Sequence, residues 1–334
     1  MRIISGKYKG RKLATFEGDA IRPTSDRAKE GVFSVLQFEL VNKRFYDGFC
    51  GSGAMGIEAL SRGAKEAVFT DSAVKSCNLT KKNLQTLGET QRVINTDCVA
   101  FLKGTKEKFD VIFLDPPYKS NAGMEALKVI GERDILNENG IAIIESGNAV
   151  NQPIEGLILE KTKKYGIAQF SFYRKANKDL AVFAGSFDPI TKGHKHIVEK
   201  ALSQFSKVIV AMGINENKTY TFDKYTRLNM LKCTFEHMPG VEVESFDGLL
   251  VDFLKQNRTV NNVRGIRNQK DFEYEEGMLA INKKMMPEIK NIYISADESM
   301  QGVSSTEVKR AKENGESWQE YIPEEALSII LNKN

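Results

Sequence analysis

The chain has 334 residues, of which 41% are hydrophobic and 28% charged, and its formal net charge is +4. This length predicts about two domains with separate cores. No apolar run approaches the roughly 18 residues that a membrane-spanning helix needs, so we expect no membrane partner. The four cysteines form no CxxC pair and the N-terminus has no apolar signal-peptide core, so we expect a reducing cytoplasm and no zinc site.

Charge is uneven along the chain. Residues 1–178 carry 28 Lys and Arg against 21 Asp and Glu, whereas the remainder carries 20 against 23. The first part is therefore net +7 and the second net −3. A basic first part favours a polyanionic partner, and the mildly acidic second part suggests none.

Apolar strands alternate with helical stretches through the first half. Strands are predicted at 45–49, 66–70, 92–95, 109–114 and 140–145, with a last β-like segment at 165–174. Helices are predicted between them, for example at 54–61 and 72–87. This alternation predicts a doubly wound, mostly parallel α/β sheet.

A short polar stretch, KANKD at 175–179, ends this series, and none of its side chains is suited to a core. The pattern then restarts, with strands predicted at 180–184, 207–212, 241–245, 259–264 and 290–295. The halves show no similarity to each other. We therefore expect two fused α/β domains in tandem, 1–178 and 179–334, each doubly wound and Rossmann-like.

A glycine-rich turn follows the first predicted strand. The segment DGFCGSGAMG at 47–56 places Gly51, Gly53 and Gly56 in a GxGxxG pattern, and Asp71 lies where an acid could hold ribose hydroxyls. Dinucleotide and S-adenosylmethionine sites share this layout. Asp47 stands where a dinucleotide site would carry an apolar strand residue, which favours the methyl donor.

The segment FLDPPYKS at 113–120 ends another strand, at the edge where open α/β sheets place their chemistry. Prolines stiffen the backbone and leave carbonyl oxygens free to accept. An exocyclic amine that attacks a methyl group needs acceptors for its hydrogens, which Asp115 and the Pro116 carbonyl can supply. Tyr118 offers a flat surface for the base.

Residues 1–175 resemble the bacterial small-subunit ribosomal RNA guanine-N2 methyltransferases, through RIISGKYKGRKL at 2–13, RPTSDRAKEGVF at 22–33, the glycine turn and DPPY. The resemblance implies a methyltransferase fold and methyl transfer from S-adenosylmethionine to a guanine amine within assembling ribosomal subunits. Methyl transfer of this kind needs no metal, because the sulfonium is already an activated leaving group. Its implied cofactor contacts are Asp47, Gly51, Gly53, Asp71 and Asp97, and its implied RNA contacts are Arg22, Thr24 and Arg27. A DNA or other RNA amino-methyltransferase, or an inactive RNA-binding module, remains open.

The second half opens with AVFAGSFDPITKGHKH at 181–196, which holds two of the chain's three histidines. Ser186 follows a strand, and Gly193 with His194 starts a helix whose free N–H groups favour a phosphate. His194 can donate to a triphosphate oxygen as charge builds in the transition state. His196 lies on another helix face, and we assign it no role.

This half resembles the nucleotidyltransferase superfamily and, over 180–332, phosphopantetheine adenylyltransferase. Lys218, VRGIRNQKDFEYE at 263–275 and GVSSTEV at 302–308 carry the match. The resemblance implies adenylyl transfer from ATP to 4′-phosphopantetheine, with Mg²⁺ bridging phosphates and no enzyme nucleophile. Its implied catalytic residues are His194, Lys218 and Arg264. Its implied ATP contacts are Ser186, Phe187, Gly265, Arg267, Glu275, Ser304, Ser305 and Thr306, and its implied acceptor contacts are Ser186, Lys218, Leu250 and Arg264.

Two positions depart from that family. Ser186 stands where threonine is common, and Met300 stands where the resemblance implies a tryptophan on the adenine side. The family tends to form hexamers, so a homo-oligomer through this half is expected. A related transferase that uses CTP or another acceptor, such as glycerol phosphate, is the alternative.

Overall fold

The structure is a computed structural model that describes residues 1–16, 26–117, 120–147, 150, 152–300 and 302–331. The chain divides into two compact units, Met1–Lys175 (unit 1) and Ala176–Asn334 (unit 2). The predicted site residues Arg22, Thr24 and Tyr118 lie outside the described residues. Among the residues described, no helix is both long enough and apolar enough to cross a membrane.

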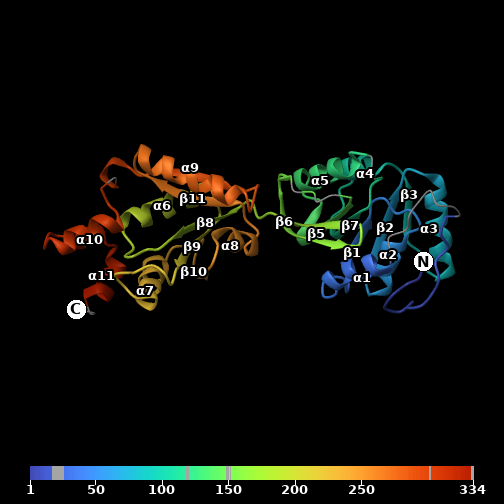
Figure 1. Ribbon diagram of the computed structural model, residues 1–334, viewed down its shortest axis with the longest axis horizontal. Coiled ribbons are helices and arrows are strands. Elements are labelled where there is room, and N and C mark those ends of the chain that lie inside the picture. Colours follow the sequence, from blue (N-terminus) through green and yellow to red (C-terminus); the bar gives the residue numbers. More distant parts are fainter. Residues whose placement is uncertain (17–25, 118–119, 148–149, 151, 301, 332–334) are drawn as a thin grey trace. The chain divides into compact units, whose positions relative to one another are not determined.

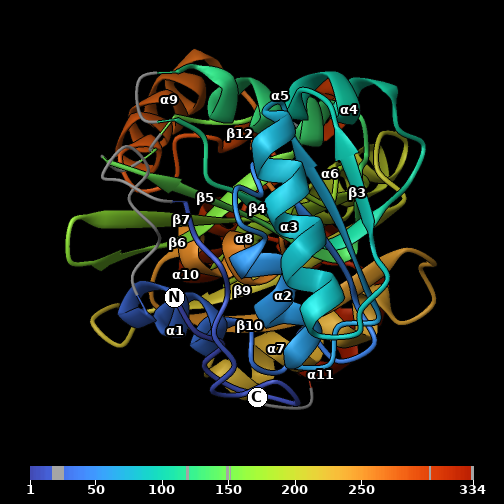
Figure 2. The ribbon, with the colours of Figure 1, turned by 90° about the vertical axis from the view of Figure 1, so that its right-hand side faces the viewer.

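Unit 1 is built on a seven-stranded sheet in the order β3-β2-β1-β4-β5-β7-β6. β7 runs antiparallel to both β5 and β6, and the other neighbouring strands are parallel. The elements are α1 (Asp26–Val35), β1 (Arg44–Asp47), α2 (Ala54–Ser61), β2 (Glu66–Asp71), α3 (Val74–Thr86), β3 (Arg92–Asn95), α4 (Cys98–Gly104), β4 (Phe109–Leu114), α5 (Ala122–Glu132), β5 (Leu136–Ser146), β6 (Leu157–Tyr165) and β7 (Ala168–Lys175). Figure 2 shows α3 next to β3 at one end of this sheet.

Side chains alternate between the two faces of this sheet. Phe45 and Phe113 belong to a core that includes Val32 of α1 and Ile57 of α2. Their neighbours along the strands, such as Tyr46, belong to a second core with residues of α4 and α5. Figure 1 shows α4 and α5 on one side of the strands and α1 and α2 on the other. The face that carries Phe45 and Phe113 is called the α1/α2 face below.

The end of unit 1 differs from the sequence prediction. A single β-like segment at 165–174 was expected, whereas β6 and β7 form an antiparallel hairpin there. β6 escapes detection because its second half, KTKKY, is largely charged, as is usual for an edge strand. The stretch KANKD was expected to carry no core side chain, but Ala176 is 4% exposed. A small residue there can be buried within an otherwise polar linker.

Unit 2 contains a five-stranded, all-parallel sheet in the order β10-β9-β8-β11-β12. The elements are β8 (Leu180–Gly185), α6 (Lys192–Leu202), β9 (Lys207–Ile214), α7 (Lys224–Phe235), β10 (Val241–Asp247), α8 (Leu250–Gln256), β11 (Asn261–Ile266), α9 (Gln269–Lys283), β12 (Lys290–Ser295), the 3₁₀ turn η1 (Glu298–Met300), α10 (Ser305–Glu313), the 3₁₀ turn η2 (Gln319–Tyr321) and α11 (Glu324–Leu331). The two sheets confirm the predicted fold class of two tandem Rossmann-like α/β domains.

Both sheets reverse their winding at one pair of strands. In unit 1 the chain winds from β1 out to β3 and then returns to β4, while in unit 2 it winds from β8 out to β10 and returns to β11. The carboxyl ends of such a pair open a crevice in doubly wound sheets. Ligand sites are therefore expected at the turns after β1 and β4 in unit 1, and after β8 and β11 in unit 2.

Candidate active sites

The turn after β1 requires glycine at two positions. Gly51 and Gly53 have φ of 54° and 77°, in the left-handed region that favours glycine. A side chain at Gly53 would start 2.7 Å from Thr80, whereas one at Gly51 would meet nothing within 4 Å. The turn is therefore closed on the Gly53 side and open at Gly51, where a ligand can approach the backbone.

Asp71 ties this turn to the end of β2. Its Oδ2 accepts the Gly51 N–H at 3.0 Å, and its Oδ1 accepts the Ala73 N–H at 2.8 Å. The carboxylate is half-buried, and each oxygen keeps further acceptor capacity. Asp97 begins α4 as its N-cap, with Oδ1 accepting the Ala100 N–H at 2.9 Å. The open Gly51 backbone and the carboxylate of Asp71 fit a nucleoside with ribose hydroxyls.

Asp47 is the last residue of β1, and its side chain reaches the glycine turn that follows. Its side chain is 2% exposed, and its Oδ2 accepts the Gly56 N–H at 3.0 Å. Burial raises the pKa of Asp47 to about 7, the negative charge of Asp71 adds to this, and the hydrogen bond from Gly56 opposes it. Asp47 thus supports the glycine turn from within, in addition to any role toward a ligand.

Asp115 directly follows β4, beside the glycine turn on the neighbouring strand β1. Burial raises the pKa of Asp115 well above its usual value, and the carboxylates of Glu145 and Asp47 raise it further. Pro116 packs closely on α5, because a side chain at Gly123 would start 2.6 Å from its ring. Glu145 is the residue that sequence reasoning missed here, since no motif marks it.

The predicted RNA contacts are only partly visible. Arg27 lies in the first turn of α1 and is exposed. Arg22, Thr24 and Tyr118 lie outside the described residues. The structure therefore gathers the glycine turn, Asp71, Asp115 and Pro116 at one edge of the sheet.

In unit 2 the turn after β8 is held in place by side-chain hydrogen bonds. Thr191 is the N-cap of α6, and with His194 it forms a capping box in which each side chain meets the other residue's backbone. Gly193 is required because a side chain there would start 2.7 Å from the carbonyl oxygen of Val303. The start of α6 can thus pack against the segment that precedes α10.

The capping box fixes the tautomer of His194. Its Nδ1 accepts the Thr191 N–H at 3.1 Å, so the ring proton of a neutral imidazole resides on Nε2. Burial lowers the pKa of His194 to about 4, and the positive charge of Arg267 lowers it further. The ring packs against Phe187, with ring centroids 5.1 Å apart. His194 is therefore a neutral donor at neutral pH.

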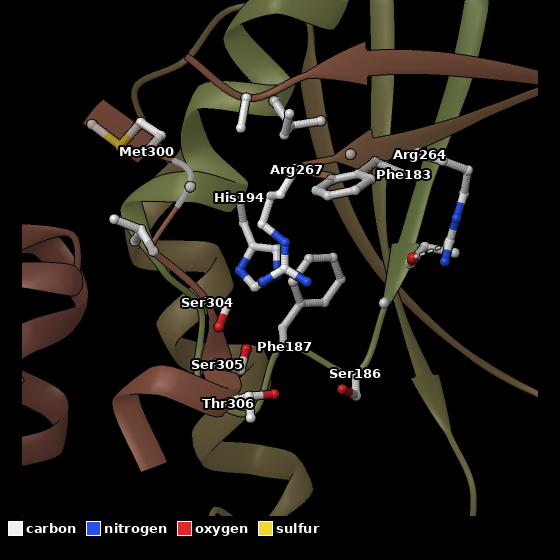
Figure 3. A pocket seen from close by; sticks show the side chains of 17 residues that line it. Phe183, Ser186, Phe187, His194, Arg264, Arg267, Met300, Ser304, Ser305 and Thr306 are labelled. Carbon is white, nitrogen blue, oxygen red and sulfur yellow. Dashed lines mark hydrogen bonds between the residues drawn. The ribbon is translucent and has the colours of Figure 1, made fainter. Parts of the chain in front are cut away.

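A cavity of about 330 Å³ lies over this turn. The predicted residues that line it are Ser186, Phe187, His194, Arg264, Gly265, Arg267, Ser304, Ser305 and Thr306, together with Met300. Figure 3 shows the guanidinium of Arg267 beside the His194 ring, with the three hydroxyl residues of the α10 start along another side. Three other predicted residues, Lys218, Leu250 and Glu275, are not among its lining residues.

The cations of this site already have partners. Arg264 forms a two-point ion pair with Glu275, with Nε 2.6 Å from Oε2, and donates from Nη1 to the Ala184 carbonyl at 2.9 Å. Arg267 donates from Nε to Asp271 at 2.8 Å. Lys218 is exposed, with its ammonium 5.8 Å from the ring centre of Tyr220. Phosphate groups would have to compete for Arg264 and Arg267.

Hydroxyls at the start of α10 are also engaged. Ser304 is the N-cap of α10, and its Oγ accepts the Glu307 N–H at 3.1 Å. The Ser305 hydroxyl donates to the Pro189 carbonyl at 2.8 Å. Ser305 thus helps to hold the loop after β8 against the start of α10, whereas Ser304 caps the helix itself. Thr306 is exposed.

Two buried side chains, which no sequence motif had marked, support the loop after β8. Asp188 is 1% exposed and accepts from Lys309 at 2.6 Å and from the backbone N–H of Phe222 at 2.9 Å. Although burial opposes it, the pKa of Asp188 is lowered by Lys309 and by two backbone N–H groups. Arg227, 1% exposed, donates to the Ser186 carbonyl at 2.7 Å. The acid in FDP was the only sequence signal for this network.

Two family models match the chain. Residues 1–174 match Conserved hypothetical protein 95, and residues 182–311 match the Cytidylyltransferase-like family. The first of these covers more than half of the chain.

Curated relatives match each unit separately. Phosphopantetheine adenylyltransferase of Heliobacterium modesticaldum is 40% identical over 46% of this chain and 92% of its own length. The enzyme of the same name from Clostridium beijerinckii is 37% identical over 46% of this chain and 97% of its own length. Ribosomal RNA small subunit methyltransferase D of Haemophilus influenzae is 38% identical over 52% of this chain and 93% of its own length. The chain therefore belongs to the Conserved hypothetical protein 95 family, as a relative of methyltransferase D, over its first unit and to the phosphopantetheine adenylyltransferase family over its second, and it is a transferase with both a methyltransferase and a nucleotidyltransferase part.

Proposed function

We propose that unit 1 transfers a methyl group from S-adenosylmethionine to the 2-amino group of a guanine in small-subunit ribosomal RNA. The observation that carries this proposal is the placement of Asp115 and Pro116 at the carboxyl end of β4, beside the glycine turn of β1. The relationship to methyltransferase D supports the ribosomal substrate. The basic charge of this part of the chain suits an RNA partner.

Some residues of unit 1 would hold the cofactor, and others would accept the hydrogens of the attacking amine. The open backbone at Gly51 and the carboxylate of Asp71 would hold S-adenosylmethionine, with Asp97 nearby on the next strand end. When bound, this cofactor supplies a methyl group on a positively charged sulfur. Asp115 and the Pro116 carbonyl accept the hydrogens of the attacking amine, and Asp115 holds the proton that the amine releases. Tyr118 and Arg27 would contact the base and the RNA, with Arg22 and Thr24.

Methyl transfer from labelled S-adenosylmethionine should be measured on unmethylated small subunits, free ribosomal RNA and DNA. We expect product on the ribosomal particle, mapped as N2-methylguanosine by digestion and mass spectrometry. Product on DNA, or at a different amine, would instead identify a related amino-methyltransferase. Cofactor binding without any product would identify an inert RNA-binding module.

We infer that unit 2 transfers the adenylyl group of ATP to 4′-phosphopantetheine, giving dephospho-coenzyme A and pyrophosphate. The observation that carries this is the half-buried, neutral His194, which keeps its proton on Nε2 and lines a cavity together with Arg267 and the start of α10. The acceptor phosphate attacks the α-phosphorus in line, and pyrophosphate leaves, so no enzyme nucleophile is needed. His194 donates to the oxygens that gain charge.

The remaining residues would surround the same reaction. Arg264 and Lys218 neutralise phosphate charge after Arg264 leaves Glu275, and Leu250 contacts the pantetheine arm. Mg²⁺ would enter this site bound to the triphosphate of ATP. The described residues that line the cavity include no carboxylate, so its ligands would be phosphate oxygens and water.

Pyrophosphate release should be measured with ATP and 4′-phosphopantetheine, and in parallel with CTP and glycerol phosphate. We expect release only in the first mixture. Release with the second pair would assign unit 2 to a related transferase with another acceptor. We place the boundary between the two activities near residue 178, and we expect unit 2 to assemble as a homo-oligomer, which sedimentation of the full chain tests.

A further inference from the structure

Glu145 lies at the same sheet edge as Asp115. β4 and β5 are parallel neighbours, and their last register pair is Leu114 with Ile144. Asp115 and Glu145 are the next residues of the two strands. The carboxyl ends of adjacent parallel strands thus present two acids side by side, one of which belongs to the DPPY motif.

The side chain of Glu145 points to the α1/α2 face of the sheet. Phe113 and Ile143, two residues before Asp115 and Glu145, are in the core on the α1/α2 face. Phe170, the register partner of Glu145 on β7, is in that core too. Since strand side chains alternate, Glu145 is directed toward this face, and Asp115 follows β4 directly beside it. Their charges interact, because Glu145 raises the pKa of Asp115.

Guanine offers two neighbouring donors, its 2-amino group and its N1–H. Asp115 and the Pro116 carbonyl account for the hydrogens of the amine. We propose that Glu145 accepts the N1–H of the target guanine and thereby selects guanine over purines that carry a 2-amino group without an N1–H. This inference rests on the methyltransferase function proposed above. Glu145 is 5% exposed, so a base whose unprotonated N1 faces it would place two acceptors against each other in a buried site.

The test compares guanine with 2,6-diaminopurine, which keeps the 2-amino group but has no hydrogen on N1. Small subunits are reconstituted from RNA with either base at the position that the wild-type chain methylates. Wild type should prefer guanine in kcat/KM by about 10- to 100-fold. Glu145→Gln should reduce this preference to about threefold or less, because its amide can donate to the bare N1.

Matched variants separate specificity from folding. Glu138→Gln changes an exposed acid on the same strand and should leave both rates unaltered. Glu145→Asp keeps the charge, so it should keep the preference for guanine even where its rates fall. Melting temperature, S-adenosylmethionine affinity and adenylyl transfer of each full-length variant report whether it is folded.

Two results would overturn the inference while leaving the proposed function intact. One is a wild-type enzyme that methylates both bases equally well. The other is a Glu145→Gln variant that slows both bases by the same factor, which is the behaviour of a merely structural acid. If wild type forms no N2-methylguanosine in ribosomal RNA, the proposed function fails first, and the inference falls with it.

Discussion

The two strand-to-helix turns that open the candidate sites are built in opposite ways. After β1 the chain turns on glycines, and α2 begins without a side-chain cap. After β8 the turn is fixed by side chains, with Thr191 and His194 capping α6 and Arg227 holding the Ser186 carbonyl. A glycine turn lets a ligand approach the backbone, whereas a turn held by side chains can aim one donor at a fixed point.

The two sites also differ in the charge of the side chains around them. Asp71 and Asp115 mark the edge in unit 1, with Glu145 on the neighbouring strand. The cavity in unit 2 is lined by Arg264 and Arg267 and, among the residues that the structure describes, by no acid. A sulfonium cation and a triphosphate anion are the ligands that these opposite potentials favour. One doubly wound fold can therefore serve either charge, according to the side chains at its switch point.

The largest expected effect is a loss of activity in unit 2 alone. His194→Ala should lower kcat for adenylyl transfer by about 10²- to 10³-fold, because it removes a preorganised donor. Methyl transfer by the same protein should not change. Pyrophosphate release and labelled methyl incorporation, measured on one preparation, check both statements.

The neighbouring histidine supplies the control. His196 lies 2.9 Å from Asp297 and does not line the cavity, so His196→Ala should change adenylyl transfer by less than about threefold. If His194→Ala abolished both activities in a folded protein, the two sites could not be independent.

Asp115→Asn tests the acidic site. The amide keeps one acceptor but cannot hold the proton that the amine releases, so methyl transfer should fall about 100-fold. S-adenosylmethionine affinity, measured by calorimetry, and adenylyl transfer should stay close to wild type. Unimpaired methylation would contradict the role of Asp115.

The pKa of Asp47, raised to about 7, predicts a pH-dependent stability of unit 1. The unfolded carboxyl loses its proton near pH 4, whereas the folded one keeps it up to about 7, so stability falls as pH rises through this window. Asp47→Asn should remove this loss, since its side-chain oxygen can still accept from Gly56. We expect the variant to gain about 3 kcal/mol over wild type at pH 8 relative to pH 5.

Hydrogen exchange across residues 44–61 measures this difference within the full chain. The pH dependence of exchange is compared between wild type and variant after correction for the intrinsic rate. Equal pH profiles for the two proteins would show that Asp47 keeps an ordinary pKa in the folded state.

Thr191→Val should have the smallest effect. It removes the hydroxyl that caps α6, which costs about 1 kcal/mol of stability. The backbone N–H of Thr191 still fixes the His194 tautomer, so adenylyl transfer should fall by less than about tenfold. Thr191→Ser keeps the cap and serves as the control. A loss as large as that of His194→Ala would mean that the hydroxyl itself contacts substrate.

The two α/β domains and the two turns at their sites could be predicted from the sequence, because each is marked by a local pattern of residues. Strand-and-helix alternation predicted the two sheets, and the spacings in 47–56 and 181–196 predicted which turns to inspect. β6 was missed because a charged edge strand lacks apolar alternation. The pairing of Arg264 with Glu275, and the proximity of Glu145 to Asp115, depend on contacts between separate elements, and no local pattern encodes them.

The pair of Arg264 with Glu275 has a consequence for turnover. The guanidinium has a resident counter-ion, with Nε held 2.6 Å from the Glu275 carboxylate. In the proposed reaction, a phosphate that binds Arg264 would displace this carboxylate and would gain less affinity than it would at an unshielded cation. Glu275 would return to Arg264 as product leaves, so the residue that weakens phosphate capture would also speed product release.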